Sequence, residues 1–229
     1  MRKALAIAVV ALWPALAGAQ LPEDALEPAL THWRAASWYL RTDNADVAAL
    51  ELETFREKWH ALGAAAPAGV AGLAETASVA LGTNDVVTAN RTLGAIGDRL
   101  AEARRLAGQS GFPEAMRRYR DEIEAIGGIM RASGQRNSDR PMDSALKAAV
   151  REAAVITRDA ASALPPLVPE RWKDDTRLRT LLGQNVDGVS AVITAIDRTQ
   201  TPLASGLEIA GLISVVRANY NLLFLNYGY

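Results

Sequence analysis

The sequence predicts an all-α protein, an antiparallel helical bundle of seven to eight helices that can also be divided into two packed four-helix-like halves. Three observations lead to this fold class. Apolar residues recur at steps of three and four over long stretches, which is the pattern of amphipathic helices. Short turns rich in Gly, Pro, Asn and Asp separate these stretches. Finally, 49% of the 229 residues are hydrophobic, which is enough to bury a core.

The first 19 residues have the pattern of a secretory signal peptide. Arg2 and Lys3 precede an apolar run over residues 4–16, and Ala17-Gly18-Ala19 stands directly before Gln20. The alternative is a membrane anchor, but the run is shorter than the roughly 20 residues that a spanning helix needs. We therefore expect signal-peptide cleavage, a periplasmic mature protein in a bacterium, and no membrane insertion after removal of the signal.

The first helical hairpin is predicted over residues 33–62. One helix ends near Arg41, the polar turn Thr42–Asp46 follows, and Asp43 or Asn44 is suited to cap the next helix. The apolar positions of that second helix are spaced by four, three, four and three: Ala48, Leu52, Phe55, Trp59 and Leu62. Because the turn is short, the two helices should lie antiparallel and adjacent.

Three further helices are predicted before residue 133. One begins near Val70 and pauses at residues 81–85, and the next keeps a three-four repeat from Val86 through three heptads. Pro113 suits the first turn of the third. Its apolar stripe is Met116, Tyr119, Ile123, Ile126 and Met130. Arg117, Arg118 and Arg120 on this helix could attract an anion, but the neighbouring Asp121, Glu122 and Glu124 favour surface ion pairs instead.

The polar segment at residues 134–141 is predicted to be a linker between an N-terminal helical half (20–133) and a C-terminal helical half (142–229). The C-terminal half contains a helix over 142–163, an extended proline-rich stretch over 164–169, and a helix over 172–199 with an irregularity at 183–188. The last helix, 202–227, has apolar residues on two sides.

A stack of helical hairpins resembling tetratricopeptide repeats is the alternative architecture. Leucine followed by a short polar turn occurs near residues 40, 81 and 182. Since the spacings between these turns are unequal, the bundle is the preferred prediction.

The stretch LGTNDVVTANRTLGAIGDRLAEARRLAG at residues 81–108, with its Ala-rich antiparallel helices, resembles the cytochrome c′ and cytochrome b562 class of exported four-helix bundles. The resemblance covers residues 24–133 at the level of helix pattern. It implies a bundle that serves an electron-transfer or envelope system. Cytochrome c′ attaches haem through C-x-x-C-H, and this chain has no cysteine, so that covalent chemistry is not carried over.

We predict no cofactor and no enzymatic activity. A haem held without a covalent bond, as in the b562 class, would need one His and one Met on facing helices, and His60 with Met116 or Met130 is the candidate set. A stripe methionine is more often core filler. No repeated Glu-x-x-His pair, H-E-x-x-H, G-x-S-x-G or phosphate-binding glycine loop occurs.

The predicted function is that of a non-catalytic interaction or accessory protein that binds an unknown protein partner or itself. The alternative is a bundle that binds a small ligand, haem or a metal. The interface candidates lie at the end of the last helix, where we expect partial exposure: Tyr220, Phe224, Leu225, Tyr227 and Tyr229. The formal net charge of −1 gives no reason to expect nucleic acid as a partner.

Overall fold

The structure of the protein, a computed structural model, describes residues 23–106, 111–199 and 203–228, and its regular elements there are all helical. The eight α-helices are α1 (Glu23–Arg41), α2 (Ala45–Ala61), α3 (Val70–Gly82), α4 (Val86–Leu106), α5 (Phe112–Ala132), α6 (Ser144–Ser162), α7 (Thr176–Asp197) and α8 (Gly206–Tyr227). Short 3₁₀ turns occupy Gly63–Ala65, Pro165–Leu167 and Glu170–Trp172. The predicted all-α fold with seven to eight helices is confirmed. The signal-peptide prediction falls on residues outside the described ranges.

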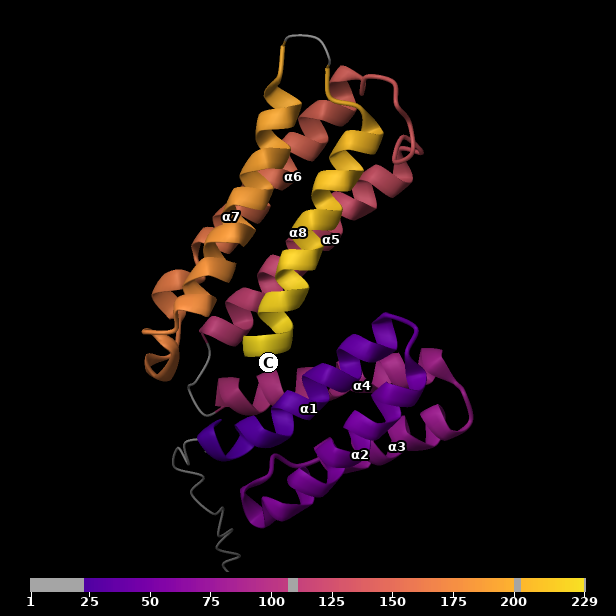
Figure 1. Ribbon diagram of the computed structural model, residues 1–229, viewed down its shortest axis with the longest axis vertical. Coiled ribbons are helices and arrows are strands. Elements are labelled where there is room, and N and C mark those ends of the chain that lie inside the picture. The colour runs from indigo at the N-terminus through magenta and orange to yellow at the C-terminus, as the bar shows by residue number, and fades with distance from the viewer. Residues whose placement is uncertain (1–22, 107–110, 200–202, 229) are drawn as a thin grey trace, which may run out of the picture.

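The helices form two four-helix groups, each with its own hydrophobic core. The N-terminal bundle contains α1 to α4 and is centred on side chains such as Leu52, Phe55 and Ile96. The C-terminal bundle contains α5 to α8, with Ile123 and Val189 among its buried residues. Figure 1 shows the N-terminal bundle lying across one end of the longer C-terminal bundle, where the end of α8 meets α1.

Each group closes on itself, which separates this fold from a stack of hairpins. Within the N-terminal bundle α1 packs against both α2 and α4, and within the C-terminal bundle α5 packs against both α6 and α8. An open stack would leave its first and fourth helices apart. The bundle prediction is therefore the one that the structure supports.

The boundary between the two cores differs from the predicted linker at 134–141. Helix α5 shares its core with α6 to α8, so the chain passes from one bundle to the other between Leu106 and Phe112. The polar loop after α5 is bound to the start of α8: the Leu207 amide donates to the Ser138 carbonyl oxygen at 2.8 Å. A Cβ on Gly206 would lie 1.8 Å from the Gln135 carbonyl oxygen. The loop is polar because it caps α8 and faces water. A linker between domains has the same polar composition, so the sequence does not distinguish the two.

Helix starts follow the local sequence closely. The Asn44 side chain accepts a hydrogen bond from the Val47 amide, as expected for the cap of α2. Asp143, Asp175 and Ser205 cap α6, α7 and α8 in the same way. These contacts determine where the helices begin. They involve residues only a few positions apart, so the local sequence also determines which positions of each helix face the core.

Helix α7 runs unbroken through residues 183–188, where the sequence predicted an irregularity. Asn185 is fully buried, donates to the Leu181 carbonyl oxygen at 2.8 Å, and accepts a hydrogen bond from the Tyr119 hydroxyl at 2.9 Å. Its amide group is therefore satisfied inside the helix and does not end it. Gly188 lies against α8, where a Cβ would come within 3.2 Å of Val216. The polar and glycine residues here serve helix packing.

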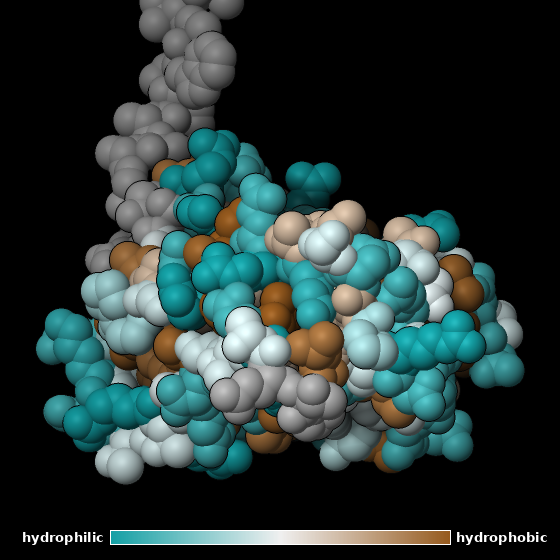
Figure 2. Space-filling view, turned by 90° about the horizontal axis from the view of Figure 1, so that it is seen from above, coloured by the Kyte–Doolittle hydropathy of each residue, from teal (hydrophilic) through white to brown (hydrophobic). Residues whose placement is uncertain are grey.

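No described helix is both long enough and apolar enough to cross a bilayer. Seen from above, the surface is mostly hydrophilic with small, separate hydrophobic areas (Figure 2).

Candidate ligand site between the two bundles

A cavity of about 180 Å³ lies where the end of the C-terminal bundle meets α1 and α4. Helices α1, α4, α5 and α8 all contribute to it, so its wall comes from both bundles. Its lining residues are Trp33, Ser37, Arg41, Asn90, Leu93, Gly94, Gly97, Asp98, Met116, Arg117, Arg120, Tyr220 and Phe224. We call this space the interbundle cavity.

Aromatic and aliphatic side chains line one part of the interbundle cavity. Trp33 and Phe224 meet edge to face, with ring centroids 5.6 Å apart and planes at 72°. The Trp33 indole donates to the Leu93 carbonyl oxygen at 3.0 Å, which satisfies its polar atom. Trp33 lies directly on Gly97, where a Cβ would come within 3.0 Å of the indole ring. The glycine therefore allows the ring to lie against α4.

Three arginines surround this apolar part. Arg41 comes from α1, and Arg117 and Arg120 come from α5. Arg117 donates to the Gly97 carbonyl oxygen at 3.2 Å and lies 3.3 Å from an oxygen of Asp98, so it ties α5 to α4. Arg120 donates to its neighbour Asp121. The predicted ion pairing on this face is thus correct for Arg120, whereas Arg117 pairs with the other bundle.

Arg41 differs from the other two arginines because it forms no ion pair with any residue in the described ranges. Its Nε donates to the Ser37 carbonyl oxygen at 3.1 Å, and its guanidinium carbon lies 5.1 Å from the centre of the Phe224 ring. Part of the side chain is open to solvent. Burial lowers the pKa of the guanidinium, Tyr220 opposes this shift, and Arg120 adds to it. The two terminal nitrogens remain available to an anion.

Two hydroxyl groups complete the wall. Ser37 is 8% exposed, and its Oγ is buried without a hydrogen-bond partner among the described residues. Burial raises the pKa of the Tyr220 hydroxyl to about 12, against the opposing effect of Arg120 and Arg41. Tyr220 is therefore a neutral hydrogen-bonding group at neutral pH. A buried polar atom without a partner costs free energy, so the Ser37 hydroxyl favours a ligand or water in the cavity.

The cavity carries groups that bind an anion. Three guanidinium groups and one carboxylate line it, which leaves two net positive charges. It contains no histidine, cysteine or lysine that could act as a nucleophile or base near neutral pH. In the described part of the chain, no group of three or more His, Cys, Asp and Glu residues is placed to hold a metal ion.

The three haem-ligand candidates do not meet at one place. His60 is exposed near the end of α2 in the N-terminal bundle. Met116 and Met130 are buried in the core of the C-terminal bundle, at 2% and 1% exposure. Only Met116 reaches the interbundle cavity.

The interface candidates at the end of α8 are largely covered by the chain itself. Tyr220 and Tyr227 are each only 6% exposed, and Phe224 packs between the bundles against Trp33. Leu225 is half-buried, and Tyr229 lies outside the described residues. Phe224 and Leu225 are partly exposed, as expected. Tyr220 packs against Tyr119 and Tyr227 packs against Trp172, so these two rings are covered by the C-terminal bundle itself.

The end of α8 forms a polar contact with α1 of the N-terminal bundle and another with the start of α7 in its own bundle. Arg34, on α1 and only 1% exposed, donates to the Gly228 carbonyl oxygen at 2.8 Å and also pairs with Glu27. The Tyr227 hydroxyl donates to an Asp175 oxygen at 2.7 Å. These contacts hold α8 in the position that forms one wall of the interbundle cavity.

The sequence did not identify Ser37, Arg41 or Gly94 as site residues. Ser37 and Arg41 lie on α1 and Gly94 lies on α4, and the part of the wall formed by α8 is more than 100 residues away from each of them in the chain. Other lining residues were singled out for different reasons. Arg117 and Arg120 were recognised as able to attract an anion, Met116 was a haem-ligand candidate, and Tyr220 and Phe224 were interface candidates. The remaining members become a group only when α8 docks on α1.

Comparisons of the chain with protein-family models, with curated proteins and with solved structures gave no match. The resemblance to cytochrome bundles therefore stays a prediction.

Proposed function

We propose that this protein is a non-catalytic binding protein, exported to the periplasm, that holds a small anionic ligand in the interbundle cavity. The observation that carries the proposal is the convergence of Arg41, Arg117 and Arg120 around a cavity that also contains the buried, unpartnered Ser37 hydroxyl. This choice favours the small-ligand alternative over the accessory role.

An anion is the ligand charge that this wall supports. Guanidinium groups bind carboxylate and phosphate oxygens through charge-assisted hydrogen bonds. Arg117 is already engaged by Asp98 and Arg120 by Asp121, whereas Arg41 lacks a carboxylate partner in the described structure. An anion beside Arg41 would also relieve the repulsion between Arg41 and Arg120.

The position of the cavity supports a binding role that depends on both bundles. Ligand pockets occur preferentially at interfaces between domains. A ligand here would contact α1 and α4 on one side and α5 and α8 on the other, so its binding would stabilise the docked arrangement. Ligand binding would then make the two bundles harder to separate.

The first test measures anion binding to the chain that begins at Gln20. Calorimetry and thermal melting are performed at fixed ionic strength with phosphate, sulfate, acetate and benzoate as sodium salts. We expect at least one anion to bind, and free anion at 100 times its Kd should stabilise the protein by about 2.7 kcal/mol.

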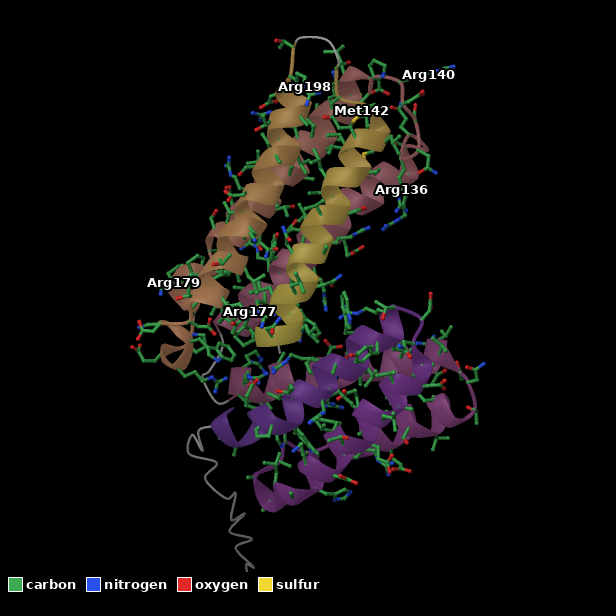
Figure 3. All side chains as sticks on the ribbon, viewed as in Figure 1. Arg136, Arg140, Met142, Arg177, Arg179 and Arg198 are labelled. Carbon is green, nitrogen blue, oxygen red and sulfur yellow. The ribbon has the colours of Figure 1, made fainter. Side chains whose placement is uncertain are left out.

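Arginine variants locate that binding. Arg41→Gln should weaken it by about 1.5–3 kcal/mol, the usual contribution of a charged hydrogen bond. Arg140→Gln is the control, because Arg140 lies at the far end of the C-terminal bundle with Arg136 and Arg198 (Figure 3). Equal weakening by both variants, or no anion binding at all, would overturn the proposal.

Export is tested separately. The intact mass of the protein recovered from the periplasmic fraction of its host should correspond to a chain that begins at Gln20. Recovery of the uncleaved chain from the cytoplasm would contradict this part of the proposal.

A second candidate function is self-association through an exposed face of α8. Residues at steps of four, four, three and four along this face are exposed and uncharged: Leu207, Gly211, Val215, Ala218 and Leu222. Leu207 and Val215 are 54% and 53% exposed. Exposed apolar rows often mark interaction sites, and a row without charges can meet a second copy of itself without repulsion.

Sedimentation at several concentrations tests this candidate. Val215→Glu should abolish a dimer that the wild type forms, whereas Val79→Glu, on the equally exposed Val79 of α3, should leave it intact. A wild type that remains monomeric at high concentration would exclude self-association through α8.

A further inference from the structure

We propose that the anion held in the interbundle cavity is a planar carboxylate of one-ring size, such as a benzoate or hydroxybenzoate. This inference rests on the proposed function, because it names the ligand class of the same site. Four features support it: the volume of the cavity, its aromatic wall, the position of Arg41, and the buried Ser37 hydroxyl.

The volume suits a single ring. The cavity measures about 180 Å³. An apolar cavity of about 150 Å³ in an unrelated protein accommodates benzene, and a water molecule takes up about 30 Å³ of liquid. One ring with a carboxylate therefore fills this space, a free phosphate or acetate leaves most of it empty, and a two-ring ligand exceeds it.

The apolar wall suits a flat ring. Trp33, Phe224 and Met116 line the cavity together with Leu93. Trp33 and Phe224 already meet edge to face, the arrangement that aromatic rings prefer, and a third ring can join them in the same geometry. Met116 adds a polarisable thioether, which makes favourable contacts with ring edges.

The carboxylate belongs beside Arg41. The Arg41 guanidinium lies over the Phe224 ring and has no acidic partner in the described chain, so a ring that packs against Phe224 brings its carboxylate to these nitrogens. Arg120 lines the same cavity, so the carboxylate also lies in the field of a second positive charge. Hydrogen bonds between a guanidinium group and a carboxylate are charge-assisted and stronger than those between neutral groups.

The Ser37 hydroxyl predicts a second polar group on the ring. Its Oγ is buried, lines the cavity and has no partner among the described residues. A ring hydroxyl can donate to it or accept from it. At least one hydroxybenzoate isomer should therefore bind more tightly than benzoate, and Ser37→Ala should remove that difference while retaining benzoate binding.

Gly94 offers a way to fill the cavity without disturbing the fold. It lines the cavity, and a Cβ built on it meets no atom within 4 Å. A leucine there would project into the space where the ring is proposed to lie. Leucine also favours a helix interior over glycine, so Gly94→Leu should retain or raise helical stability. Gly72→Leu is the matched control, because Gly72 on α3 is equally open and does not line the cavity.

The experiment measures binding by calorimetry to four proteins: wild type, Gly94→Leu, Gly72→Leu and Ser37→Ala. The ligands are benzoate, the hydroxybenzoate isomers, cyclohexanecarboxylate, benzyl alcohol, acetate and phosphate. We expect benzoate to bind at least about ten-fold more tightly than acetate, phosphate and the neutral alcohol, and more tightly than the non-planar acid. Gly94→Leu should abolish benzoate binding with unchanged circular dichroism, and Gly72→Leu should retain it.

Two results overturn the inference and separate it from the proposed function. If phosphate or acetate binds as tightly as benzoate and Arg41→Gln weakens that binding, the ring is not recognised, and the inference fails while the proposed function stands. If none of these anions binds the wild type, both fail.

Discussion

The two bundles reach similar burial with different side chains. In the N-terminal bundle α3 contributes Val70, Ala74, Ala77 and Ala80 to the core, so its neighbours approach closely over small residues. The C-terminal bundle contains the buried hydrogen bond between Tyr119 and Asn185. We therefore expect the core around α3 to be sensitive to added volume, and the C-terminal bundle to be sensitive to the loss of this hydrogen bond.

The largest expected effect comes from breaking the junction between the bundles. Deletion of residues 224–229 removes the Phe224 contact with Trp33, the Gly228 carbonyl that Arg34 binds, and the Tyr227 contact with Asp175. Loss of a buried aromatic alone costs about 3–5 kcal/mol. We expect urea unfolding to shift strongly and to split into two transitions as the bundles unfold separately. An unchanged single transition would show that the end of α8 does not join them.

Added volume in α3 should have the next largest effect. Ala77 is fully buried, so Ala77→Leu overpacks the N-terminal core and should lower the free energy of unfolding by about 1–3 kcal/mol. Ala71→Leu, at an exposed position of the same helix, should change it little. Urea unfolding of both variants checks the comparison, and a tolerated leucine at position 77 would contradict the tight packing of this bundle.

Loss of the buried hydrogen bond in the C-terminal bundle should lower the free energy of unfolding by a similar or smaller amount. Tyr119→Phe leaves the Asn185 side-chain oxygen without its donor and should cost about 1–3 kcal/mol. Replacing both residues, as in Tyr119→Phe with Asn185→Leu, should recover part of the loss because no polar atom is then left unpaired. A double-mutant cycle by chemical denaturation measures this coupling, and strict additivity would contradict it.

The smallest expected effect is a change in how the melting temperature depends on pH in the acid range. The hydrogen bond from Tyr227 is the main cause that lowers the pKa of Asp175 below its ordinary value of 3.8. A lowered carboxyl pKa stabilises the folded state above the unfolded value, and this contribution is lost as pH falls through the folded value. The melting temperature of Tyr227→Phe should therefore lie further below wild type at pH 7 than at pH 3. A difference that grows on acidification would be inconsistent with this pair.

Much of the secondary structure followed from local patterns. The caps at Asn44 and the repeat from Val86 placed α2 and α4 correctly, because capping and periodicity involve residues a few positions apart. Two predictions differ from the structure for separate reasons. The polar segment at 134–141 is bound to α8 through the main-chain oxygen of Ser138, and side-chain composition does not show such a contact. Asn185 has a buried partner on another helix, and the sequence does not show whether a polar residue faces water or a buried partner.

The candidate site was less accessible to prediction than the fold. Arg117 and Arg120 were recognisable as potential anion ligands, but the sequence could not show that Arg41, Ser37 and Tyr220 lie beside them. The aromatic residues at the end of α8 were predicted to form an interface with another molecule. In the structure Phe224 packs against Trp33 of the N-terminal bundle, whereas Tyr227 packs against Trp172 within its own bundle.

The helical character of this protein could be predicted because hydrophobic periodicity and helix caps involve a few neighbouring residues. Three other features came only from the three-dimensional arrangement: α5 belongs to the second bundle, the end of α8 lies against α1, and three arginines line one cavity. Each of these features depends on contacts between residues far apart in the chain. Such contacts form only when two packed cores meet, and the pattern within any one helix leaves them open.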